Sequence, residues 1–397
     1  MSDQACLIQS NHVEGRECRE NVKIIIGADF VPTDSNRSLF EKEEMNELFG
    51  KELLEELKSG DLRIFNLEAP ITNAKELLPK AGSPNLKTYP QCIKVFNHLK
   101  PLVLTGANNH IYDYKDRGIQ DTLNLLQSHQ IHVTGFGENR TDASQPKILL
   151  INGYRIGIYA CSEHEFCCAG KNHGGGNGYD PLTTFDDITC TRKQCDYLIV
   201  LFHGGRENYR YPSPGLKAIC NKMVASGADL VVCQHSHCIG AYEPYKKGMI
   251  VYGQGNFLFD YNDIEEWKTS ILIEVVLEKK TTQVFVIPIE KYGNCVRISK
   301  QKQKQILSDF QTRSEEIRDY GFIAKTWQEF LHSQTSVLLL RGIMGINNRF
   351  LLGIDKYMFS GRMVKILFTP KRTRLLLNYL RCESIREGIL TLLEENS

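Results

Sequence analysis

Residues 23–29 read KIIIGAD, a short apolar run that ends in a carboxylate. A run of this length, rich in isoleucine, predicts a strand that is buried on both faces. Similar apolar runs that end in polar clusters recur along the chain, as LRIFNLE at 62–68, LVLTGANNH at 102–110, YLIVLFH at 197–203 and LVVCQHSH at 230–237. In open α/β sheets, ligands bind beyond the carboxyl ends of the strands. If these strands share one sheet, their polar clusters converge.

The segments around these runs divide the chain into three parts. Residues 1–21 are polar and are expected to be disordered or loosely attached. Residues 22–300 alternate between predicted strands and helices, with a β-hairpin expected through Asn152-Gly153. Residues 301–397, in which basic and apolar residues are interleaved, predict a helical C-terminal extension. The alternation by itself predicts a single open α/β sheet for the central part.

The composition is that of an ordinary soluble protein. Of 397 residues, 42% are hydrophobic and 24% are charged, and the net charge of +1 gives no overall field that favours nucleic acid. The thirteen cysteines are odd in number and irregularly spaced, which favours reduced thiols. No run approaches the roughly 20 apolar residues of a membrane helix, and residues 1–20 lack the apolar core of a secretory signal. We therefore expect a cytoplasmic protein.

Three histidines lie at the ends of predicted strands. His235 and His237 are two residues apart, so in an extended or tightly turned backbone both imidazoles can face one site. His203 ends another strand in the same way. A surface pair of histidines is the alternative, but the repeated position at strand ends favours metal ligands.

Carboxylates and amides occupy the ends of the other predicted strands. Asp29 and Glu68 suit a site of mixed nitrogen and oxygen ligands that accepts zinc, manganese or iron, and Glu68 is the candidate bridge between two ions. Asn109 offers an amide oxygen, and His110 is the candidate general acid. A helix cap is the alternative role for Asp29 and for the asparagines.

Three further residues are candidates for substrate binding. Asn256 lies in the turn Gly253–Phe257, where it can position either substrate or a histidine, although a plain turn is equally compatible. Asn108 and Glu207 lie beside the predicted ligands.

Together these motifs resemble the bacterial capsule-synthesis protein A (CapA-like) family, the poly-gamma-glutamate capsule biosynthesis proteins related to calcineurin-like metallophosphoesterases. The matching segments are Gly27–Asp29; Asn66–Pro70; Ala107–His110 with Asp113, Gly118 and Thr122; His203–Gly205 with Glu207 and Pro212; Gly227–Asp229; His235–His237 with Glu243 and Tyr245; and Gly255–Phe257. They lie between residues 23 and 260.

The resemblance implies an α+β fold, a four-layer metallophosphoesterase-like αββα sandwich, instead of one open sheet. It also implies two divalent metal ions, with His110 beside the substrate. One ion would be held by Asp29, Glu68 and His237, and the other by Glu68, Asn109, His203 and His235. The sequence departs from the superfamily pattern at Val31, which stands where a histidine ligand is expected, and at Glu68, which replaces an aspartate.

The implied function is that of a metal-dependent hydrolase, with a phosphoester bond favoured, in the biosynthesis of a capsule or another cell-surface polymer. Its substrate would be a phosphorylated or polymer-precursor molecule, and its partners would be capsule-assembly enzymes. The alternatives are a non-catalytic accessory protein of polymer assembly and an amide hydrolase acting on gamma-glutamyl substrates. Residues 361–382 carry six basic and no acidic residues, which indicates either peripheral membrane contact or a helical cap on the catalytic domain.

Overall fold

The computed structural model describes residues 5–12, 20–80, 83–260, 264–335, 337–345 and 362–394. It divides into two compact units, Met1–Ala324 and Lys325–Ser397. The predicted domain ended at residue 300, but helix α9 (Gln303–Glu316) lies in the first unit. Ile306 and Phe310 of α9 are buried in the core of that unit, which explains why the division falls later in the chain.

Two large β-sheets form the centre of the first unit. The larger has the order β1-β16-β15-β2-β3-β4-β5, with β14 also paired to β2 and β17 to β16. Its strands are β1 (Cys6–His12), β2 (Val22–Phe30), β3 (Leu62–Asn66), β4 (Leu102–Thr105), β5 (His132–Thr134), β14 (Asn256–Leu258), β15 (Thr269–Leu277), β16 (Thr281–Tyr292) and β17 (Cys295–Ile298). Strands β2 to β5 are parallel, so their carboxyl ends meet at one edge.

The smaller sheet has the order β12-β13-β11-β10-β8-β7. Its strands are β7 (Lys147–Ile151), β8 (Tyr154–Ser162), β10 (Tyr197–His203), β11 (Leu230–Gln234), β12 (Tyr242–Tyr245) and β13 (Gly248–Val251). The predicted hairpin through Asn152-Gly153 is confirmed, because Ile151 is paired with Tyr154. Strands β6 (Phe136–Gly137) and β9 (Gly175–Gly176) form a separate small ribbon.

Successive side chains of each central strand pack alternately into two hydrophobic cores. Ile24 and Ile26 of β2 pack between the two sheets, while Ile25 faces the helices. Ile64 and Phe65 of β3 divide in the same way. Because successive side chains of a strand point to opposite faces, a fully apolar strand must be covered on both sides.

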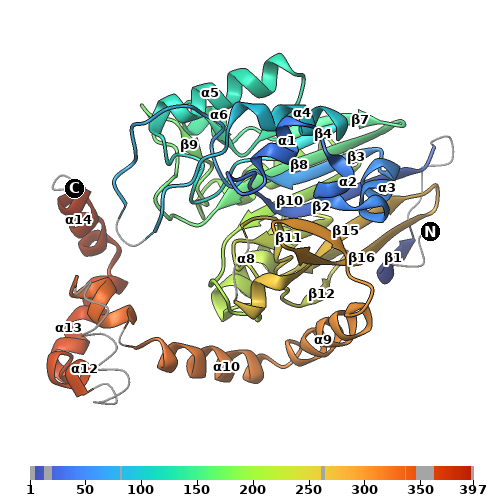
Figure 1. Cartoon of the computed structure of the whole chain (residues 1–397). Coiled ribbons are helices and arrows are strands. Elements are labelled where there is room, and N and C mark those ends of the chain that lie inside the picture. Colours follow the sequence, from blue (N-terminus) through green and yellow to red (C-terminus); the bar gives the residue numbers. More distant parts are fainter. Residues whose placement is uncertain are drawn as a thin grey trace. The chain divides into compact units, whose positions relative to one another are not determined.

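Helices cover the outer faces of both sheets (Figure 1). The larger sheet is covered by α1 (Arg37–Glu41), α2 (Met45–Phe49), α3 (Lys51–Ser59), η1 (Pro90–Cys92), α4 (Ile93–His98) and α5 (Lys115–Ser128). The smaller is covered by α7 (Thr184–Arg192) and α8 (Pro214–Ala225). The short elements α6 (Arg140–Ala143) and η2 (Glu265–Lys268) lie in connections. The four-layer αββα sandwich is therefore confirmed, and the single open sheet that alternation suggested is wrong.

The N-terminal segment differs from its prediction. Residues Cys6–His12 form strand β1, which pairs antiparallel with β16, where a loosely attached segment was expected. The backbone hydrogen bonds of an unpaired sheet edge favour such an added strand. The remaining residues of that segment lie outside the described part of the chain, except at 5 and 20–21.

The described part of the second unit consists of helices and short connections between them. It contains the end of α10 (Tyr320–Ser333), the π-helical turn η3 (Val337–Ile343), α12 (Arg362–Leu367), α13 (Pro370–Arg381) and α14 (Glu383–Glu394). Within the described ranges, no helix has both the length and the apolar content that crossing a bilayer requires. Several leucines of α13 are exposed, among them Leu375 and Leu380. Membrane contact through 361–382 stays a prediction, and residue 361 itself lies outside the described residues.

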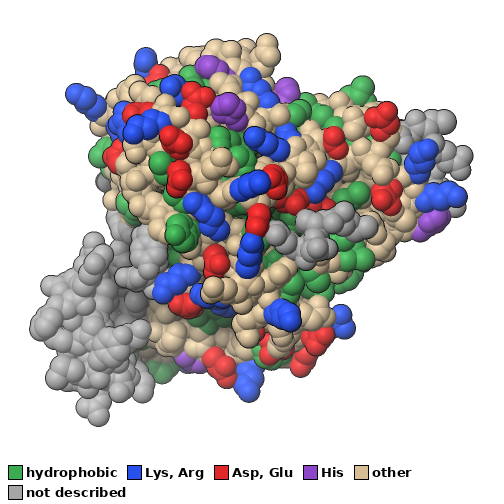
Figure 2. All heavy atoms as spheres, turned by 45° about the vertical axis from the view of Figure 1, so that its right-hand side comes forward, with side chains coloured by type: hydrophobic (Ala, Val, Ile, Leu, Met, Phe, Trp, Pro, Cys, Tyr) green, Lys and Arg blue, Asp and Glu red, His purple; other side chains and the backbone are tan. Residues whose placement is uncertain are grey.

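Charged residues of both signs are distributed evenly over one face of the molecule. Figure 2 shows basic and acidic side chains interspersed on the face that it draws. That face carries no large field of one sign, in keeping with the net charge of +1.

Candidate metal centre

The strand ends of both sheets supply polar side chains to one place. All six predicted ligands are almost fully buried. Five of them end or follow a parallel strand, and the sixth, Asp29, lies within its strand close to the end. Asp29 lies near the end of β2, Glu68 and Asn109 follow β3 and β4, His203 ends β10, and His235 and His237 follow β11. The site therefore spans two sheets, because the carboxyl ends of β2, β3 and β4 face those of β10 and β11.

The turn after β11 gives its two histidines an unusual backbone. His235 has φ of 86° and His237 has φ of 54°, in the left-handed region that non-glycine residues rarely adopt. Such conformations cost about 1–3 kcal/mol each and persist where the surroundings impose them, often at functional sites. Here they turn two imidazoles that are two residues apart into the same buried site.

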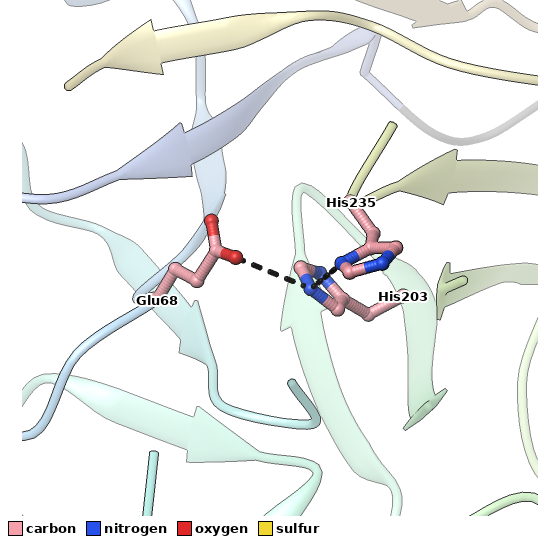
Figure 3. A group of neighbouring side chains, drawn as sticks. All are labelled: Glu68, His203 and His235. Carbon is pink, nitrogen blue, oxygen red and sulfur yellow. Dashed lines mark hydrogen bonds and ion pairs between the residues drawn. The ribbon is translucent and has the colours of Figure 1, made fainter. Parts of the chain in front are cut away.

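Glu68, His203 and His235 form the first ligand group (Figure 3). His203 Nε2 lies 3.4 Å from Glu68 Oε1 and 3.2 Å from His235 Nδ1. All three side chains point toward one another from different strands. Ligand atoms at this spacing can all reach one ion, because metal–ligand distances are about 2.0–2.2 Å.

Asp29, Glu68 and His237 form the second group. His237 Nδ1 lies 3.6 Å from Asp29 Oδ2. In each group, one atom from every residue lies within 4.8 Å of the others. Glu68 belongs to both groups, which is the position that a bridging carboxylate occupies between two ions.

The carboxylates have the chemistry that a cation site needs. Asp29 Oδ2 and both oxygens of Glu68 are buried without a hydrogen-bond partner among the described residues. Burial raises the pKa of Glu68 to about 7, and burial together with the nearby Glu68 charge raises the pKa of Asp29 to about 7. A buried carboxylate without a partner is costly, and a divalent cation would stabilise its charged form.

The histidines are suited to bind as neutral ligands. Burial lowers the pKa of His203 to about 4 and lowers that of His235 well below its usual value. Neutral imidazole is the form that binds metals. Both the carboxylates and the histidines of this cluster are therefore suited to bind a divalent ion.

Asn109 lies beside the first group, and its role as a ligand stays a prediction. Its Oδ1 lies 3.1 Å from His203 Nε2, and its Nδ2 donates to Glu165 Oε2 over 3.2 Å. Glu165 Oε2 also lies 3.6 Å from His235 Nε2. Sequence reasoning missed Glu165, because it lies in a loop without a motif that marks it.

Asn66 and Asn108 form an internal brace behind the ligands. Asn66 Nδ2 donates to Asp29 Oδ1 over 2.8 Å and lies 3.3 Å from His203 Nδ1. Its Oδ1 accepts from Asn108 Nδ2 at 2.9 Å, and Asn108 Oδ1 accepts from the backbone N–H of His110 and Ile111. Asn108 was predicted to bind substrate, but both ends of its amide are used within the protein.

His110 is held by a buried ion pair. Its Nδ1 lies 2.7 Å from Asp113 Oδ2, and Asp113 also pairs with Lys80 Nζ. Lys80 Nζ donates in addition to the backbone oxygen of Asn109 over 2.7 Å. With Nδ1 engaged by Asp113, Nε2 is the ring nitrogen left to serve a substrate.

Val31, Glu207 and Asn256 complete the predicted set. Val31 packs in an apolar cluster with Phe259 and Trp267, so the end of β2 offers no second ligand. Glu207 is exposed, and its charge raises the pKa of Glu68, so it lies near the site. Asn256 Oδ1 lies 2.8 Å from His237 Nδ1.

Comparisons with known proteins identify relatives of this chain. Residues 23–261 match the family model of the bacterial capsule synthesis protein PGA_cap. The chain is 29% identical over 263 residues to the "PGA biosynthesis protein CapA" of Bacillus subtilis, covering 64% of this chain and 68% of that protein. It is 29% identical over 245 residues to the "Capsule biosynthesis protein CapA" of Bacillus anthracis, covering 59% of each.

More distant likenesses extend the comparison. A Mycobacterium tuberculosis protein described as a "Probable polyglutamine synthesis accessory protein" is 27% identical over 218 residues, 51% of this chain and 57% of that one. A solved structure, titled as a novel phosphatase from Mycoplasma pneumoniae, aligns with a TM-score of 0.43 and 14% identity over 69% of this chain and 95% of that one. The match over residues 23–261 shows that this chain belongs to the bacterial capsule synthesis protein PGA_cap family.

Proposed function

We propose that this protein is a metal-dependent hydrolase that cleaves a phosphoester bond in the synthesis of a capsule or a related surface polymer. One observation carries the proposal, namely that Glu68 belongs to both ligand groups while both of its oxygens are buried without a hydrogen-bond partner among the described residues. A carboxylate in this position is suited to join two ions. The ligand set of imidazole, carboxylate and amide favours zinc, manganese or iron.

When bound, a pair of divalent ions polarises a phosphoryl oxygen and activates water for in-line displacement. The protein's own residues would serve the two ends of that reaction. Asp29, Glu68 and the three histidines would hold the ions at the site where the phosphoryl group binds. His110 Nε2 would donate a proton to the leaving oxygen, while Asp113 holds the ring through Nδ1.

The context of the reaction comes from the relatives. The PGA_cap family and the names of the Bacillus proteins place their members in capsule and PGA biosynthesis. We therefore propose a phosphorylated or polymer-precursor substrate and enzymes of capsule assembly as partners. Glu207, exposed beside Glu68, stays a candidate for substrate contact.

A second candidate function is that of a non-catalytic accessory protein. The description of the Mycobacterium tuberculosis relative as an accessory protein favours it, and so does Val31, whose apolar packing leaves the end of β2 with one ligand. An amide hydrolase acting on gamma-glutamyl peptides is a third, since two-metal sites also serve aminopeptidases.

Metal content and turnover together distinguish these functions. The purified full chain is loaded separately with manganese, zinc and iron, analysed for bound metal, and assayed against phosphomonoesters, phosphodiesters and gamma-glutamyl peptides. We expect about two ions per chain and metal-stimulated phosphoester cleavage that His235→Ala abolishes. His98→Ala, at an exposed histidine of α4 away from the cluster, is the matched control.

Each alternative has its own signature in these assays. Bound metal without turnover on any of these substrates selects the accessory function, and gamma-glutamyl cleavage alone selects the amide hydrolase. Absence of bound metal, or turnover that persists in His235→Ala, would refute the proposed chemistry.

A further inference from the structure

The second ligand group has fewer protein ligands than the first. Asp29, Glu68 and His237 supply three side chains, whereas Asn109 accompanies Glu68, His203 and His235 in the first group. We propose that Asn256 Oδ1 is the missing ligand, bound to the ion that Asp29, Glu68 and His237 hold. This inference rests on the proposed function, because it requires that the site binds metal.

The sheet itself places Asn256 at this position. Strand β14 pairs in parallel with β2, and Asn256 stands directly opposite Asp29 in the register. Residues in register on adjacent strands point to the same face of a sheet. Asn256 is 1% exposed and Asp29 is fully buried, so both side chains face the interior site. Strand β14 thus supplies a ligand side chain beside Asp29, which the end of β2, occupied by Val31, does not.

The distances fit two ligands of one ion. His237 Nδ1 lies 2.8 Å from Asn256 Oδ1 and 3.6 Å from Asp29 Oδ2. Ligand atoms about 2.1 Å from one ion lie about 3.0–3.5 Å apart at tetrahedral and octahedral angles. Since both oxygens flank the same ring nitrogen, an ion bound to Nδ1 can be reached by both.

A hydrogen bond between His237 Nδ1 and Asn256 Oδ1 is the alternative to a shared ion. Such a bond would place a proton on His237 Nδ1, the nitrogen that also faces Asp29 Oδ2, and a protonated Nδ1 cannot bind an ion. The ring itself packs against Trp267 at 4.4 Å and Phe259 at 5.6 Å between ring centroids. Asn256 Nδ2 is buried without a hydrogen-bond partner among the described residues under either assignment, so the test must act on Oδ1.

The assignment makes the two ligand groups alike. Asn109 Oδ1 lies 3.1 Å from His203 Nε2, as Asn256 Oδ1 lies 2.8 Å from His237 Nδ1. Each ion would then have the shared carboxylate of Glu68, at least one imidazole and one amide oxygen. Neutral amide oxygens add ligands to a site that already buries two carboxylates, without adding negative charge.

Cobalt spectroscopy of the full chain tests the assignment. In Asn256→Cys, a thiolate replaces the amide oxygen, and cobalt bound to it would show a sulfur-to-metal charge-transfer band that the cobalt-loaded wild type lacks. Ser236→Cys is the matched control. Ser236 lies between the two histidines, but its Oγ donates to the backbone oxygen of Cys238 over 3.2 Å. We expect the band in Asn256→Cys and not in Ser236→Cys.

The outcomes separate this inference from the proposed function. Cobalt bound to Asn256→Cys without the band, or an equal band in Ser236→Cys, would overturn the ligand assignment and leave the metal centre standing. A wild type that binds no cobalt would overturn both. If Asn256→Cys does not fold, Asn256→Leu decides by ion count: loss of one ion per chain supports the assignment, and full retention of metal overturns it.

Discussion

The variant Glu68→Gln should be more stable than the wild type without metal and less stable than the wild type with metal bound. In the metal-free protein, burial raises the pKa of Glu68 from 4.5 to about 7. The folded state therefore binds the proton more tightly than the unfolded state, so the ionised carboxylate lowers stability increasingly as pH rises from about 4.5 to 7. Glutamine has nearly the same shape and carries no charge, so the variant does not bear this cost.

The magnitude follows from the pKa. At about 1.36 kcal/mol per pH unit, the metal-free variant should be more stable than the wild type by up to about 3 kcal/mol at about pH 8 and by about 1.4 kcal/mol at about pH 5.5. Metal should reverse the order. A ligand present at about 100 times its Kd stabilises the folded state by about 2.7 kcal/mol per site, and the variant lacks the carboxylate common to both groups.

Urea denaturation at the two pH values, with chelator and with added manganese or zinc, measures both effects. Glu55→Gln, at an exposed carboxylate of α3, is the matched control and should show neither. If the metal-free variant is less stable than the wild type at pH 8, the carboxylate has a partner that the structure does not show. If metal stabilises the variant and the wild type equally, Glu68 is not a ligand.

Three further predictions concern the surroundings of the site and the core. Asn66→Ala, which removes the brace of Asp29 and His203, should weaken metal binding about 10- to 100-fold by isothermal titration calorimetry, and an unchanged Kd would contradict that role. Leu62→Ala, between the two sheets, should lower the free energy of unfolding by about 2–5 kcal/mol in urea, whereas Leu182→Ala, with 82% of the residue exposed, should change it by less than about 0.5 kcal/mol. Burial lowers the pKa of Lys291 to about 7, so the unfolded state binds more protons between pH 7 and 10.5 and wild-type stability should rise through that range. Lys291→Met should flatten this rise, and equal slopes in wild type and variant would argue against the lowered pKa of Lys291.

Sequence patterns correctly predicted the features that depend only on residues close together in the chain. The apolar runs form strands at the expected places, because a run of isoleucine, leucine and valine is stable only when covered on both faces. Boundaries were less predictable. The helical spacing and strong helix formers of residues 39–59 predict one helix, but the segment forms three, α1 to α3, and α2 ends where Gly50 adopts φ of 70°. A turn of this kind depends on packing against strand β17, which lies about 250 residues away in sequence.

The sequence by itself determined which polar side chains lie at the ends of the buried strands. The resemblance of its motifs to those of the family indicated how these side chains would form two ligand groups. That much is local, because a carboxylate or imidazole after an apolar strand must lie at the edge of a sheet. Only the tertiary structure placed the ends of β2, β3 and β4 against those of β10 and β11 across two sheets. It also showed that Asn108 braces the site from within, that Glu165 supports Asn109 and His235, and that Asn256 stands opposite Asp29. These contacts join residues distant in sequence, so they arise from the packing of whole strands and no local pattern encodes them.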